Sequence, residues 1–89
     1  MISHVNIGTN DLEKAEVFYN ELLALYNGKQ VMKNERSLFY SLGENSAKLA
    51  INLPFDGQPA TAGNGGMLAL TADSTALVDQ LHAKALALG

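Results

Sequence analysis

The first 26 residues constrain the fold more than any other stretch of this chain. Residues 2–8 alternate between apolar and polar side chains, and a period of two is typical of a strand with two different faces. The apolar positions are Ile2, Val5 and Ile7, and the polar positions are His4 and Asn6. We therefore expect a short strand over residues 2–8 that presents one apolar face and one polar face.

A helix is predicted directly after this strand, over residues 11–26. Gly8 ends the alternation, Asn10 can cap the helix, Glu13 stands where a capping box places a carboxylate, and Asp11 adds negative charge in the first turn. Apolar residues then recur at helical spacing, at Leu12, Ala15, Tyr19, Leu22, Leu23 and Tyr26. This apolar stripe is expected to pack on the apolar face of the strand, with Asn27-Gly28 ending the helix through a left-handed glycine.

Length and composition indicate one small folded domain. The chain has 89 residues, of which 47% are hydrophobic and 17% charged. A net charge of −3 argues against nucleic acid and against an anionic membrane as partners. The chain has no cysteine, no signal-peptide pattern at its amino terminus and no apolar run long enough for a membrane span. We expect a soluble cytoplasmic protein.

The rest of the chain predicts four more strands and a second helix. The strands are expected at 29–35, 37–42, 47–53 and 66–72, and the helix, capped by Asp73 or Ser74, at 74–88. A loop rich in Gly and Pro separates the fourth strand from the fifth at 54–65. The order β-α-β-β-β, loop, β-α predicts an α+β fold in which the opening strand–helix unit recurs at 66–88.

The predicted sheet has two different faces. Both helices are expected to cover the apolar face, formed by Val5, Ile7, Leu49, Ile51, Leu68 and Leu70. The opposite face collects His4, Asn6, Lys48, Asn52, Met67 and Thr71. A concave face of mixed polarity is a place for a small ligand. The sequence does not fix whether Phe39 or Tyr40 faces this cleft, and we assign Tyr40 to it.

The opening segment resembles the vicinal-oxygen-chelate superfamily, which holds glyoxalase I, bleomycin-resistance proteins and extradiol dioxygenases. The resemblance lies in a first-strand histidine followed by D-L-x-x-A-x-x-F-Y-x-x-x-L, and it continues through the later segments over essentially the whole chain. The matching residues are His4, Asp11, Leu12, Ala15, Phe18, Tyr19 and Leu23. It implies two βαβββ modules around a cleft, with 1–53 as a complete module, 54–65 as the inter-module loop and 66–89 as a partial second module that lacks its last three strands.

The resemblance also implies where metal ligands would lie. His4 stands at the first-strand ligand position, Asn52 where a carboxylate is expected, and Met67 where a second histidine is expected; the fourth position lies beyond Gly89. A neutral amide and a thioether are poor ligands for the divalent ions of such sites. We therefore expect no metal and no other cofactor, and metal-dependent chemistry is disfavoured.

Three functions are left open. The first is a metal-free, bleomycin-resistance-type protein that binds a small organic molecule through His4, Asn6, Tyr40, Asn52 and Met67. The second is a metal-dependent glyoxalase-type lyase or dioxygenase, and the third is a truncated relic domain without a ligand, held together by dimerisation. The candidate site residues also have structural interpretations. His4 can be a hydrogen-bonded strand residue and Met67 an apolar filler. An unpaired strand at 66–72 would favour a homodimer that covers it.

Overall fold

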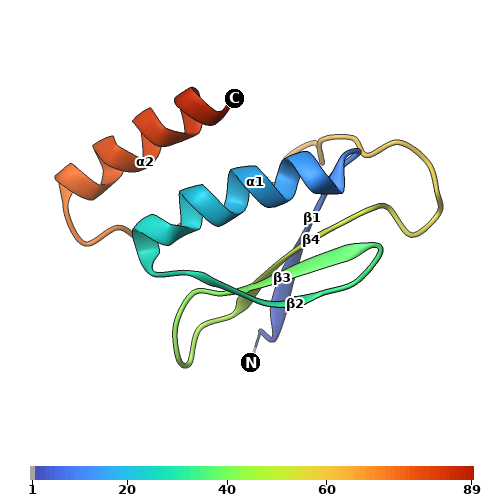
Figure 1. The fold of residues 1–89 in the computed structure, drawn as a ribbon, viewed down its shortest axis with the longest axis horizontal. Coiled ribbons are helices and arrows are strands. Elements are labelled where there is room, and N and C mark those ends of the chain that lie inside the picture. Colours follow the sequence, from blue (N-terminus) through green and yellow to red (C-terminus); the bar gives the residue numbers. More distant parts are fainter. Residues whose placement is uncertain (1) are drawn as a thin grey trace.

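The computed structural model describes residues 2–89 and has the α+β architecture expected (Figure 1). The elements in chain order are β1 (His4–Gly8), α1 (Leu12–Leu23), the short 3-10 helix η1 (Ala24–Tyr26), β2 (Lys29–Lys33), β3 (Ser37–Ser41), β4 (Lys48–Asn52) and α2 (Thr75–Leu88). The first four strands and the first helix were all predicted, with ends that differ by at most three residues.

The four strands form one sheet in the order β1-β4-β3-β2. β1 pairs with β4 in parallel, and β3 pairs with both β4 and β2 in antiparallel register. β1 and β2 are therefore the two edges of the sheet, and α1 crosses one of its faces (Figure 1).

The core lies between α1 and this face of the sheet. Its buried members are Ala15, Leu23, Leu38, Tyr40, Leu49 and Ile51. On β1 the side chains of Val5 and Ile7 are half-buried, whereas those of His4 and Asn6 are exposed. The alternation of the first strand thus predicted its two faces correctly, and burial of the apolar face is the main term that holds helix and sheet together.

Both ends of α1 use different residues from those expected. Asp11, rather than Asn10, is the N-cap, and its carboxylate accepts a hydrogen bond from the Lys14 N–H at 3.1 Å. Beyond α1, at the end of η1, Asn27 takes the left-handed conformation, with φ 58°, in place of Gly28. Gly28 is needed for a close approach, because a Cβ there would lie 2.9 Å from the Leu23 carbonyl oxygen.

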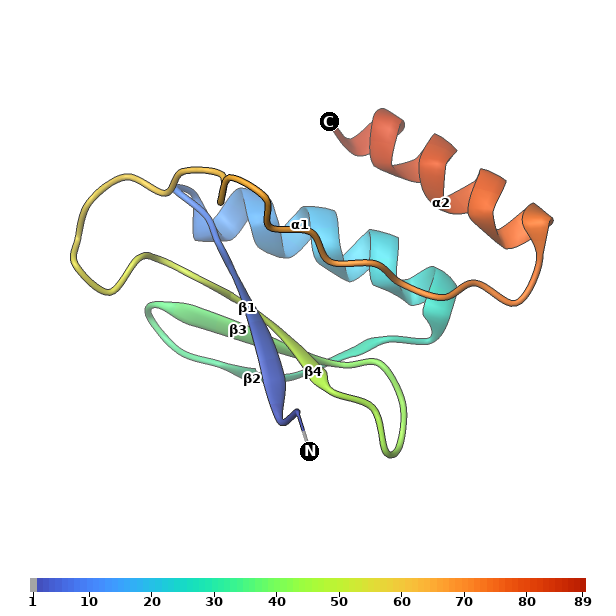
Figure 2. The same cartoon turned by 180° about the vertical axis from the view of Figure 1, so that it is seen from behind.

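The strand predicted at 66–72 does not form. No residue of this segment belongs to the sheet that the structure describes, and Leu68 and Leu70 are 40% and 41% exposed. Figure 2 shows the segment passing alongside α1 on its way to α2. The alternation was correct for a strand, but a strand needs a partner for its backbone N–H and C=O groups, and residues 66–72 pair with no strand of the described sheet.

The second helix covers less of the protein than expected. Ser74 caps α2 by accepting from the Leu77 N–H at 3.1 Å. The helix packs against α1 and η1, on the side of α1 away from the sheet, and none of its residues is fully buried (Figure 1). The prediction that both helices cover the sheet was wrong, because the unpaired segment at 66–72 leads α2 to α1 instead. No helix within residues 2–89 is long and apolar enough to span a membrane.

Candidate functional site

The face of the sheet opposite α1 carries a row of side chains that runs across all four strands. Asn6 on β1 is paired with Ala50 on β4, Ala50 with Phe39 on β3, and Phe39 with Met32 on β2. We call this row the open face. Phe39, the alternative that the sequence left open, therefore lies on the side that we assigned to Tyr40.

His4 and Phe39 meet over the middle of the open face. Their ring centroids lie 5.5 Å apart in an edge-on arrangement. β4 separates the two strands that carry them, so the rings lean toward each other across it. Ala50 is completely buried although it lies outside the core between helix and sheet, and we attribute this burial to the two rings. His4 is thus exposed to solvent but has an aromatic neighbour, and Ser3 Oγ lies 3.1 Å from its Nδ1.

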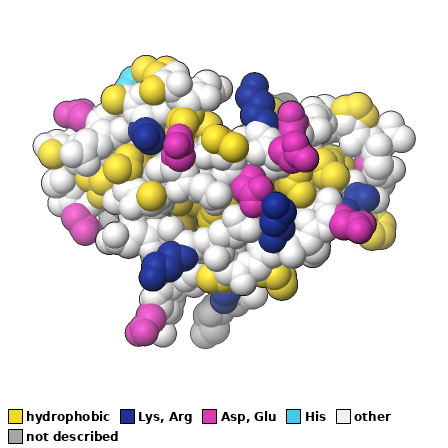
Figure 3. Space-filling model, in the orientation of Figure 1, with side chains coloured by type: hydrophobic (Ala, Val, Ile, Leu, Met, Phe, Trp, Pro, Cys, Tyr) yellow, Lys and Arg dark blue, Asp and Glu magenta, His cyan; other side chains and the backbone are white. Residues whose placement is uncertain are grey.

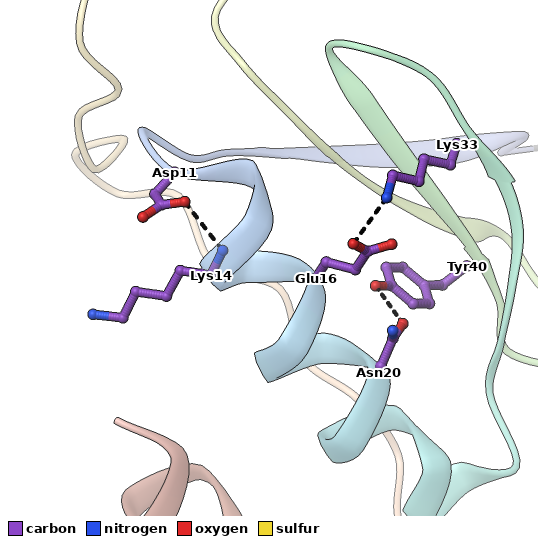
Figure 4. A network of polar contacts seen from close by, with 6 residues as sticks. All are labelled: Asp11, Lys14, Glu16, Asn20, Lys33 and Tyr40. Carbon is purple, nitrogen blue, oxygen red and sulfur yellow. Dashed lines mark hydrogen bonds and ion pairs between the residues drawn. The ribbon is translucent and has the colours of Figure 1, made fainter.

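Tyr40 lies on the other face of the sheet. Only 1% of its surface is exposed, and its hydroxyl donates to Oδ1 of Asn20 on α1 at 2.8 Å (Figure 4). Burial raises the pKa of Tyr40 to about 12, with Glu16 and Tyr19 adding to the shift. Its assignment to the cleft was wrong, because the register of β3 points alternate residues to opposite faces and places Tyr40 under the helix.

A small polar network surrounds Tyr40 and joins α1 to β2. Lys33 Nζ lies 3.0 Å from Oε1 of Glu16, and the two residues flank the tyrosine hydroxyl (Figure 4). Burial raises the pKa of Tyr19 in the same cluster. The Lys33 side chain is about half exposed, so this ion pair contributes little to stability by itself. The network orients the helix on the sheet, and Glu16 and Lys33 also line a hollow of about 420 Å³ beside the start of α1.

The largest hollow that touches the predicted residues lies at the edge of β1. It measures about 820 Å³ and lies between β1 and the segment 60–68. Asn6 and Met67 both line it, and Met67 is 91% exposed. The structure therefore brings these two together, while His4 and Asn52 are not among the residues that line this hollow.

One side chain holds the far wall of the hollow in place. Asn10 accepts a hydrogen bond from the Ala60 N–H at 2.5 Å and donates to the Ala60 carbonyl at 3.4 Å. Its amide thus pairs with residue 60 as a backbone peptide group would. No local pattern predicted this contact, since residues 10 and 60 are far apart in the chain and Asn10 was interpreted as a helix cap.

The near wall of the hollow is the free edge of a strand. The Thr9 N–H donates to the Asn52 carbonyl, and the Ser3 carbonyl accepts from the Lys48 N–H. The odd-numbered residues of this edge strand therefore bond to β4. The N–H and C=O groups of His4, Asn6 and Gly8 consequently point toward the edge. A compound that enters the hollow meets backbone donors and acceptors on one side and apolar atoms, including Met67, on the other.

The residues at the predicted ligand positions do not fit a divalent ion. His4 is paired with Lys48 and Gly8 with Asn52, which places the α-carbons of His4 and Asn52 about 13 Å apart at about 3.3 Å per residue. The open-face residues of β4 that lie nearest His4 are Lys48 and Ala50. Neither supplies a carboxylate or imidazole, and residues 2–89 contain no group of three or more His, Cys, Asp or Glu able to hold a metal.

Charged residues are mixed on the helix side of the molecule. Figure 3 shows acidic and basic side chains interspersed over α1 and α2, with apolar atoms between them. The face in this view therefore carries no broad patch of charge of one sign.

Comparison with known proteins agrees with this fold. No curated protein matches the chain. A solved structure that is similar to it is the crystal structure of a glyoxalase/bleomycin resistance protein from Albidiferax ferrireducens T118, with a TM-score of 0.89 and 39% sequence identity. The match covers 100% of this chain and 72% of that one. The model of the Glyoxalase/Bleomycin resistance protein/Dioxygenase superfamily matches residues 1–89. The chain belongs to this superfamily.

Proposed function

We propose that this protein binds a small organic molecule, without a metal ion, in the hollow between β1 and residues 60–68. The observation that supports this most directly is the composition of the hollow, in which the unpaired edge of β1 and the side chain of Asn6 face the exposed thioether of Met67. Its volume of about 820 Å³ lies within the range of small-molecule sites. We thus assign the ligand to the edge of the sheet, next to the face on which we first expected it.

The chemistry of the hollow favours binding over metal-dependent catalysis. A glyoxalase-type lyase or dioxygenase needs a metal ion to polarise substrate oxygens. The spacing of His4 and Asn52 and the thioether at Met67 do not supply its ligands. Backbone N–H and C=O groups, by contrast, select compounds with amide or carbonyl groups, and Met67 adapts its shape to an apolar part of the ligand.

Thermal denaturation in the presence of candidate compounds tests this proposal. The first compound is bleomycin, because the superfamily is described by resistance to it, and small aromatic amides complete the panel. A ligand that binds only the folded state raises the midpoint of unfolding, and we expect that rise to be the same before and after dialysis against EDTA. Stoichiometric zinc, nickel, manganese or iron that survives this dialysis would instead revive the lyase or dioxygenase alternative.

We further propose that the functional form is a homodimer. Residues 66–72 have the alternation of a strand but pair with no strand of the described sheet, so the same segment of a second copy would supply the missing ladder and leave the β1 edge to the ligand. Dimerisation through this segment would cover Leu68 and Leu70 and close the open side of the hollow.

Light scattering at micromolar concentration measures this association. We expect the mass of a dimer for the unmodified protein and the mass of a monomer for Leu70→Asp, with Val78→Asp on α2 as a control that stays dimeric. A monomer for the unmodified protein contradicts the proposal. A dimer without any ligand-induced change in stability would favour the third alternative, a domain that has lost its ligand.

A further inference from the structure

Three places in this chain have a glycine after Asn or Asp, the sequence in which a side-chain carbonyl is most open to attack by the next backbone nitrogen. They are Asn27-Gly28, Asp56-Gly57 and Asn64-Gly65. Glycine favours the reaction because it has no side chain to shield its own amide nitrogen. In the folded protein, the three sites differ in whether the glycine N–H already donates a hydrogen bond.

Two of the three glycine nitrogens are held by hydrogen bonds. The Gly28 N–H donates to the Leu23 carbonyl at 2.8 Å, and the Gly57 N–H donates to the Pro54 carbonyl at 3.1 Å. Gly28 is also packed so closely that an added Cβ would meet Leu23. Each nitrogen must leave its partner before it can turn toward the preceding side chain, and at Gly28 the end of α1 must open as well.

The third nitrogen is free of such contacts. Within residues 2–89, the structure shows no hydrogen bond from the Gly65 N–H, although the neighbouring Gly66 N–H donates to Gly63 at 3.0 Å. Asn64 is exposed, nothing lies within 4 Å of a Cβ placed at Gly65, and three glycines stand within this four-residue turn. Little resists the backbone rotation that brings the Gly65 nitrogen against the side chain of Asn64.

We propose that Asn64 is a site of spontaneous deamidation and that the fold protects Asn27. The Gly65 nitrogen attacks Cγ of Asn64 and forms a C–N bond while the Cγ–Nδ2 bond breaks, and the amide nitrogen's proton leaves with the amino group as ammonia. Water then opens the five-membered imide at either of its two carbonyls and leaves aspartate or isoaspartate at position 64. The reaction consumes water and needs no oxidant or cofactor.

The product changes the surroundings of the hollow at β1. Gly63 and Gly66, on either side of the modified dipeptide, both line that hollow. Deamidation places a carboxylate next to this wall, and the isoaspartate form also lengthens the backbone there by one carbon. The protein would thus acquire one more negative charge, in addition to its formal −3, beside the site proposed for the ligand.

Peptide mass spectrometry after incubation of the full chain at mildly alkaline pH tests this inference. We expect residue 64 to gain the acid form about tenfold faster than residue 27 in native buffer, the ratio that corresponds to one engaged hydrogen bond. In strong denaturant the two rates should agree within about twofold, since both sites are then Asn-Gly in an open chain. Asn64→Gln should remove the first acidic species seen by charge-based separation. Equal native rates, faster change at Asn27, or the same ratio in native buffer and denaturant would overturn the proposal.

Discussion

His4 and Phe39 meet edge-on with ring centroids 5.5 Å apart, although the whole width of β4 separates their strands. The contact is possible because the β4 residue beneath the rings is an alanine, Ala50, which has no exposed surface. His4, which the resemblance puts at a metal-ligand position, therefore contacts Phe39 above Ala50 instead.

Enlarging the residue beneath the two rings should destabilise the protein. We expect Ala50→Leu to lower the free energy of unfolding by about 1–3 kcal/mol, because the added methyl groups must push the two rings apart. Urea denaturation measures the change. Ala62→Leu, on the exposed loop, is the matched control and should stay within about 0.5 kcal/mol of the unmodified protein. Equal stability of the two variants would show that the rings do not close over Ala50.

Tyr40 should make stability depend on pH in the alkaline range. Its pKa is raised from 10.0 to about 12 in the folded protein, so the folded state holds the phenol proton more tightly than the unfolded chain does. The resulting stabilisation is complete below pH 10 and is lost as pH rises from 10 through 12. We expect Tyr40→Phe to reduce this decline, leaving the smaller part due to Tyr19.

The same variant separates the hydroxyl from the ring. At neutral pH, Tyr40→Phe should cost about 1 kcal/mol, because it removes one hydrogen bond and leaves the exposed Asn20 free to bond with water. Urea denaturation at pH 8 and pH 11 gives both quantities. A decline between these values that is as steep in Tyr40→Phe as in the unmodified protein would assign the effect to other groups.

The glycine after α1 should tolerate no side chain. Gly28→Ala places a Cβ 2.9 Å from the Leu23 carbonyl oxygen and 3.0 Å from the Leu23 Cβ, and we expect a loss of about 1–3 kcal/mol. Gly63→Ala is its control, since nothing lies within 4 Å of a Cβ there. Its stability should change by less than about 0.5 kcal/mol in thermal or urea unfolding. If both variants unfold alike, the close approach at Gly28 is not present in solution.

Local sequence patterns predicted the elements of residues 2–53 well, because these elements find their partners within the chain. The alternation of β1 and the stripe of α1 describe two surfaces that pack on each other, so each pattern is satisfied by the other. The face of the sheet on which Tyr40 lies depended on the register of β3. Pairing with β4 decides this register, and local composition does not. The absence of a ladder at 66–72 depended on a partner strand, which no property of that segment reveals.

The candidate site was only half visible in the sequence. Asn6 and Met67, two of the five residues assigned to the site, line one hollow, but that hollow lies at the edge of β1 and not over the open face. The wall at residue 60 is held by Asn10 from 50 residues away, and such a long-range pair has no local signature.

Loosening this wall is expected to release the segment from β1. Asn10→Ala removes both bonds to Ala60, whereas Asn10→Asp keeps the acceptor for the Ala60 N–H and loses only the longer bond. We expect proteolysis within residues 61–66 to be several-fold faster in Asn10→Ala and nearly unchanged in Asn10→Asp, because about 1 kcal/mol of local stability is lost in the first case only. Equal cleavage of the two variants would mean that Asn10 does not hold the segment.

Two methionines provide the most direct measurement of the central claim. Met67 lines the hollow, and Met32 is 51% exposed at the far end of the open face, so both can be truncated without opening the core. Calorimetric titration in EDTA, with the compound that gives the largest thermal shift, should show binding that is weakened about tenfold by Met67→Ala and unchanged by Met32→Ala. Binding that requires a metal ion, or that is weakened by Met32→Ala and not by Met67→Ala, would contradict a metal-free site at the edge of β1.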